Sequence, residues 1–69
     1  MDRFAKAVGN VLKRFVERGI DVIDVKEIWI DSSIPLDMIE ELIKDGKVEI
    51  PDGVKEIRKG RSVLWKRSK

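Results

Sequence analysis

The stretch that decides the fold is IPLDMIEELIKDGKVEIPDG, residues 34–53. Its first half repeats apolar residues at the spacing of one helix face, and this stripe consists of Leu36, Ile39, Leu42 and Ile43, with Met38 beside it. Pro35 suits the first helical position because its missing N–H is not needed there. Gly46 is a typical C-terminal stop. We therefore expect a helix over residues 35–45.

Three short strands are expected after this helix, over residues 47–50, 54–57 and 62–66. The turn residues Pro51-Asp52-Gly53 and Lys59-Gly60-Arg61 separate them. Together they predict a C-terminal β-hairpin or short meander.

A second amphipathic helix is expected before the deciding stretch, over residues 3–18. Its apolar face would comprise Phe4, Val8, Val11, Leu12, Phe15 and Val16. Asp2 is a natural N-cap, and Gly19 followed by Ile20 predicts a Schellman ending with Ile20 packed on Phe15. Gly9, inside this helix, predicts a close crossing with another helix.

The connection between these helices predicts a brief strand over residues 21–25 and a short helix over residues 25–30. Asp24 and Glu27 have the spacing of a capping box at the start of that helix. Residues 31–34 are expected to form a turn.

This order of helix, short strand, short helix, turn, helix and β-hairpin resembles that of the winged helix-turn-helix superfamily. Residues 34–53 resemble the segment of that superfamily in which the recognition helix ends at a glycine and leads into the first strand of the wing. The resemblance covers the whole chain and implies one α+β domain over residues 1–69, with three helices followed by a C-terminal wing. In the family, the third helix usually enters the major groove of DNA and the wing contacts flanking phosphates.

Residues 35–45 depart from that family pattern in their charge. They contain four acidic residues and one basic residue: Asp37, Glu40, Glu41, Asp45 and Lys44. Because an acidic helix repels phosphate, we expect any DNA contact to lie elsewhere.

Charge divides the chain into three parts, although the net charge is only +2. Residues 1–20 carry five basic and two acidic residues, residues 21–54 carry three and ten, and residues 55–69 carry seven and one. The basic C-terminal part also holds Trp65 and Leu64 between cations. Such a division is typical of a protein with a polyanionic partner.

The first functional hypothesis is a small duplex-DNA-binding protein with little sequence specificity, used in transcription or replication. Its expected phosphate contacts are Lys55, Arg58, Lys59, Arg61, Lys66 and Arg67. If the exposed face of the first helix lay on the same side as the wing, its cations would enlarge the patch. The alternative is that these cations solvate the surface and pair with the acidic middle part of the chain.

The second hypothesis is an accessory subunit of a larger replication or transcription complex. It would dock a partner protein through an acidic and aromatic surface made of Trp29, Asp37, Glu40, Glu41 and Lys44. Trp29 would belong to the core or face a partner, whereas Trp65, sharing a strand face with Val63, would cover the core. A homodimer remains open.

The composition argues against several classes of function. With no Cys and no His, the chain lacks thiolate and imidazole chemistry, and its acidic residues do not have the spacing of a calcium loop. We therefore expect no catalysis, cofactor or metal. The first residues, MDRFAKAV, do not form a signal or anchor, which favours a cytoplasmic protein with no membrane partner. Abundant charge with few amides is typical of thermophile proteins.

Overall fold

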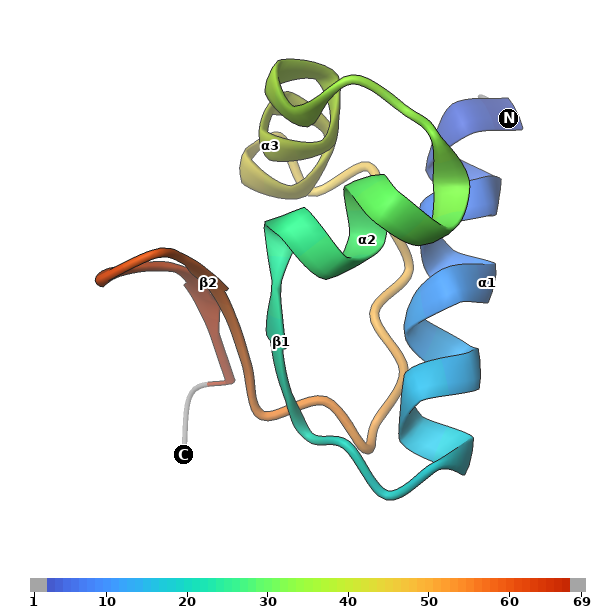
Figure 1. Ribbon diagram of the computed structural model, residues 1–69, viewed down its shortest axis with the longest axis vertical. Helices are drawn as coiled ribbons and strands as arrows, with labels where there is room; N and C mark the ends of the chain where they lie inside the picture. The colour runs from blue at the N-terminus through green and yellow to red at the C-terminus, as the bar shows by residue number, and fades with distance from the viewer. Residues whose placement is uncertain (1–2, 68–69) are drawn as a thin grey trace.

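The computed structural model describes residues 3–67, which form an α+β fold of three helices and a three-stranded sheet. In Figure 1 the long first helix lies on one side, α2 crosses the middle, and the sheet lies on the other side. The elements are α1 Arg3–Glu17, β1 Val22–Asp24, α2 Val25–Ser32, α3 Leu36–Lys44, β2 Glu56–Lys59 and β3 Ser62–Lys66.

α1 forms where its sequence predicts and ends at Glu17, one residue before the expected boundary. Its buried face consists of Ala5, Val8, Val11, Leu12 and Phe15. The Gly19 N–H donates to the Val16 carbonyl at 2.9 Å and the Ile20 N–H to the Phe15 carbonyl at 3.0 Å, which together make the predicted Schellman motif. Gly19 has φ +83°, a conformation that favours glycine. The expected cap Asp2 lies outside the described residues.

α2 is two residues longer than expected. The Lys26 N–H donates to Asp24 Oδ1 at 2.8 Å, so Asp24 caps the helix as predicted, but no reciprocal bond from Glu27 completes the box in residues 3–67. Ser32 Oγ donates to the Ile28 carbonyl at 2.6 Å and accepts from the Ile34 N–H at 3.2 Å. These bonds hold Ser32 in the helix. The turn expected over residues 31–34 is therefore confined to residues 33–34.

α3 begins one residue later than expected, because Pro35 is its N-cap and not its first helical residue. Pro35 has an extended ψ of 140°, and its carbonyl accepts the Ile39 N–H at 3.1 Å. At the other end, the Gly46 N–H donates to the Ile43 carbonyl at 3.1 Å, and the next N–H reaches the Leu42 carbonyl at 3.0 Å. The predicted stop at Gly46 is therefore confirmed.

The predicted strand over residues 47–50 is wrong. This segment is irregular, and the sheet is completed by β1, which pairs in parallel with β2 through Val22–Glu56, Ile23–Ile57 and Asp24–Arg58. A Cβ built on Gly9 would stand 3.4 Å from the Glu49 carbonyl, so the segment lies against α1. Gly9 thus marks contact with a loop, and the predicted helix crossing there is also wrong.

β2 begins later than expected, and β3 has the expected bounds but contains a bulge. The antiparallel pairs are Glu56–Lys66, Ile57–Trp65, Arg58–Val63 and Lys59–Ser62, which leaves Leu64 as the extra residue. As a result, Leu64 and Trp65 both pack against the core, whereas Val63 is 47% exposed. Trp65 covers the core as expected, but it does so with Leu64, so the prediction that it shares a face with Val63 is wrong.

Candidate nucleic-acid interface

The strands β2 and β3 form the terminal hairpin, which projects from the helices at one edge of the molecule (Figure 1). Its two-residue turn is Gly60-Arg61, and Gly60 has φ +59°, as the first central position of a type II′ turn requires. The Gly60 N–H donates to Asp24 Oδ2 at 3.2 Å. The same carboxylate that caps α2 therefore also holds the tip of the hairpin.

Three of the six expected phosphate contacts are engaged by carboxylates within the protein. The pairs are Lys55 Nζ with Asp21 Oδ2 at 3.4 Å, Arg58 Nη1 with Glu56 Oε1 at 3.1 Å, and Lys59 Nζ with Glu40 Oε1 at 3.1 Å. Lys59 shares the inward strand face with the fully buried Ile57, which directs its side chain toward α3. All three cations remain partly exposed, and such pairs contribute only about 0.2–1 kcal/mol each.

Arg67 has a structural role that the sequence did not reveal. Its Nε donates to the Val54 carbonyl at 3.0 Å and its Nη2 to the Pro51 carbonyl at 2.9 Å. Its guanidinium lies over the Trp65 ring, 5.1 Å from the centroid. Arg67 thereby ties the end of β3 to the preceding loop, while its positive charge stays uncompensated by any carboxylate within 4 Å in residues 3–67.

Arg61 and Lys66 are the two expected contacts whose side chains are exposed and, as far as the described chain extends, make no ion pair or hydrogen bond. Arg61 occupies the turn of the hairpin, and Lys66 lies at the end of β3. With Arg67 they form the group that we call the hairpin cations: Arg61, Lys66 and Arg67.

α1 carries a second group of cations on the side of the molecule opposite to the terminal hairpin (Figure 1). Arg14 pairs with Asp31 at 2.9 Å. The other four, Arg3, Lys6, Lys13 and Arg18, are exposed and have no carboxylate within 4 Å among residues 3–67. The single enlarged patch, which required α1 and the hairpin to share a side, is therefore not formed.

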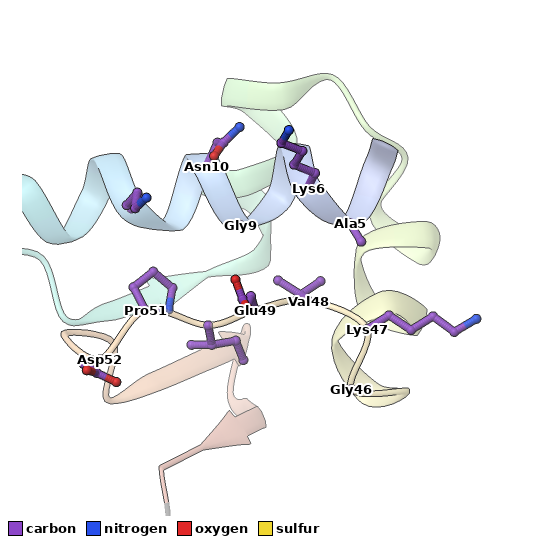
Figure 2. A pocket seen from close by; sticks show the side chains of 12 residues that line it. Ala5, Lys6, Gly9, Asn10, Gly46, Lys47, Val48, Glu49, Pro51 and Asp52 are labelled. Atoms are coloured by element: carbon purple, nitrogen blue, oxygen red, sulfur yellow. The ribbon is translucent and has the colours of Figure 1, made fainter. Parts of the chain in front are cut away.

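A groove of about 820 Å³ is lined by α1 on one side and by residues 46–52 on the other. Its helix side includes Ala5, Lys6, Gly9 and Lys13, and its loop side includes the acidic Glu49 and Asp52. Figure 2 shows the side chains of Lys6 and Asn10 directed away from the loop. Lys6 and Lys13 border the groove together with Glu49 and Asp52, but neither lysine makes an ion pair with them.

The residues of the alternative partner surface are divided between two helices. Asp37, Glu41 and Lys44 are exposed on α3, whereas Glu40 is half-buried by its pair with Lys59. Trp29 is 45% exposed, which excludes the core, the first of its two predicted places, and leaves the partner-facing one as a prediction. Its neighbour Ile30 is 74% exposed. This exposure was not predicted from the sequence, although Ile30 lies on the side of α2 opposite the buried Val25 and Ile28.

Within residues 3–67, no cluster of three or more acidic residues could hold a metal ion. In the same range, no helix combines the length and hydrophobicity needed to cross a bilayer. No protein-family model, curated protein or solved structure matches this chain. Its function is therefore inferred from where its charged side chains lie.

Proposed function

We propose that this chain is a non-enzymatic winged helix-turn-helix module that binds duplex DNA through its terminal hairpin, with little dependence on sequence. The observation that carries the proposal is that Arg61 and Lys66 on the projecting hairpin, and Arg67 directly after it, have no carboxylate partner among residues 3–67. Because duplex DNA is a dense row of phosphates, unpaired cations gain more from it than cations already engaged by carboxylates.

The other two cations of the hairpin, Arg58 and Lys59, contact phosphates only after leaving their carboxylate partners. Their internal pairs are solvent-accessible, so exchanging a carboxylate for a phosphate costs little. The same holds for Lys55, whose pair with Asp21 is the longest of the four at 3.4 Å. The proposed contact therefore starts at the turn and spreads toward the body of the protein.

Backbone contact is favoured over base stacking and groove reading. Trp65 packs against the core and has Arg67 over its ring, so it offers no open platform for an unstacked base. The exposed side of α3 carries Asp37 and Glu41, which oppose entry into a groove lined by phosphates. Both features support sequence-independent binding to duplex.

The experiment is a salt series of anisotropy titrations with a labelled random duplex, comparing the wild type with the double variant Arg61→Ala/Lys66→Ala. Each phosphate contact contributes about 0.9 to the slope of log affinity against log salt concentration. The double variant should therefore bind more weakly on every sequence and lose close to two units of slope.

A matched control removes two lysines near the end of α3, in the variant Lys44→Ala/Lys47→Ala. It has the same net charge as the hairpin variant but leaves the terminal hairpin intact. We expect its slope to stay within one unit of the wild type. Equal losses in both variants would show that net charge, and not the hairpin, drives binding, and the proposal would fail.

A second candidate function is docking of a partner protein, and the exposure of Ile30 beside Trp29 favours it. These residues, with Asp37, Glu41 and Lys44, would form an apolar centre with a charged rim in an accessory subunit or a homodimer. Sedimentation velocity over a concentration series tests the homodimer. Self-association that disappears in Ile30→Ser would support this surface, whereas a monomer at every concentration would exclude the homodimer.

A further inference from the structure

We infer that the exposed side of α1 is a second phosphate-binding surface, so that one molecule joins two separate duplexes. The inference rests on the proposed function of the terminal hairpin and extends it. The α1 cationic face is defined by Arg3, Lys6 and Lys13.

First, the cations of this face are not neutralised by carboxylates within the described chain. Only Arg14 of the α1 cations pairs with a carboxylate in the described chain, although several exposed acidic residues, such as Glu41 and Glu49, have no ion pair there either. If the basic first part of the chain served only to neutralise the acidic middle part, more of these groups would be paired. The α1 cationic face holds as many free cations as the terminal hairpin does.

The second step is its geometry. Arg3, Lys6 and Lys13 lie at helical spacings of three and seven, which places them on one side of α1, opposite the buried stripe. At a rise of 1.5 Å per residue, Lys6 and Lys13 stand about 10 Å apart along the axis, so together they can contact successive phosphates. Figure 2 shows Lys6 directed outward from the groove beside it.

The third step is separation. The α1 cationic face and the terminal hairpin lie at opposite ends of the horizontal axis in Figure 1, along which the Cα trace extends 24 Å. The exposed side of α1 faces away from the terminal hairpin, so a straight duplex docked on that side points away from the hairpin. Bending a single duplex around the protein would cost roughly 1–6 kcal/mol for 40–90° of curvature. Two duplexes avoid this cost, so bridging is the favoured use of two cationic ends.

The test mixes the protein with two short duplexes, one carrying a donor fluorophore and the other an acceptor. Energy transfer should appear on adding the wild type at low salt and disappear as salt rises. The variant Lys6→Ala/Lys13→Ala should lose energy transfer while keeping its anisotropy-measured affinity for one duplex within about threefold of the wild type. Lys44→Ala/Lys47→Ala serves as the charge-matched control and should retain the transfer.

Three results would overturn the inference. In the first, the wild type binds a duplex but gives no energy transfer, and the proposal that the terminal hairpin binds DNA would still hold. Another is full transfer by Lys6→Ala/Lys13→Ala. The third is loss of transfer in Ile30→Ser, because the bridge would then be a protein dimer with one duplex on each copy. If the wild type bound no duplex at all, the proposed function would fail together with its extension.

Discussion

At the scale of single residues, the neighbours of each cation decide whether it is available to a ligand. Arg61 and Arg67 are both arginines in the same part of the chain. The Arg67 side chain donates hydrogen bonds to two backbone carbonyls, whereas the Arg61 side chain is exposed to solvent. Residue type and local charge identified both as candidate contacts. Their different roles depend on the loop at Pro51, which folds back beside the end of β3.

Gly53 gives a prediction at this scale, because its place in the fold leaves no room for a side chain. A Cβ added there would collide with the side chain of Val16 on α1, although the backbone of Gly53 has no positive φ. We expect Gly53→Ala to destabilise the protein by about 1–3 kcal/mol through overpacking alone. Urea unfolding followed by Trp fluorescence measures this change.

A second substitution, at Val16, tests whether the collision with its side chain causes the loss of stability in Gly53→Ala. In the Val16→Ala background, Gly53→Ala should cost at least 1 kcal/mol less, roughly, because the methyl groups it meets are gone. Equal costs in both backgrounds would mean that the loop needs glycine for a reason other than contact with Val16.

At the scale of elements, local signals predicted the helices well and the sheet poorly. Periodicity located α1 and α3, and the spacing of Asp24 and Glu27 located α2. Gly19 and Gly46 fixed the ends of α1 and α3, since a Schellman motif needs only neighbouring residues. Strand pairing depends on distant segments: residues 47–50 have strand-like composition, but β1 holds the place beside β2. The bulge at Leu64, which decided how Trp65 is buried, likewise exists only in the pairing with β2.

The contact between α1 and residues 47–50 can be tested at Gly9. Alanine is favoured over glycine inside a helix by about 0.8–1 kcal/mol, and a Cβ at Gly9 would meet the Glu49 carbonyl at an acceptable 3.4 Å. We therefore expect Gly9→Ala to stabilise the protein by roughly 0.5–1 kcal/mol in urea unfolding. Gly9→Val, whose larger side chain must displace the loop, should be destabilising. A loss of stability in Gly9→Ala would show that the loop packs more tightly than this distance indicates.

At the scale of the whole molecule, cations without an ion pair in the described chain lie on both sides of the fold. The four ion pairs among residues 3–67 join α1 to α2, the residue before β1 to the residue before β2, two residues within β2, and β2 to α3. Arg3, Lys6 and Lys13 on α1 and Arg61 and Lys66 on the terminal hairpin make no ion pair in residues 3–67, and α1 and the hairpin lie on opposite sides of the molecule (Figure 1). The exposed Lys26, Lys44 and Lys47 make no ion pair in this range either. The net charge of +2 conceals this division, which was visible along the sequence but not as two separate ends.

This arrangement predicts that the free cations contribute little to folding. The quadruple variant Lys6→Ala/Lys13→Ala/Arg61→Ala/Lys66→Ala removes no ion pair in residues 3–67, so its free energy of unfolding should stay within about 1 kcal/mol of the wild type, with an unchanged m value. By contrast, Arg67→Ala removes two hydrogen bonds and the contact with Trp65, and should cost roughly 1–2 kcal/mol. A loss of several kcal/mol in the quadruple variant would make its four cations structural. Both proposed phosphate surfaces would then lose their physical basis, because side chains committed to the fold are not free to bind DNA.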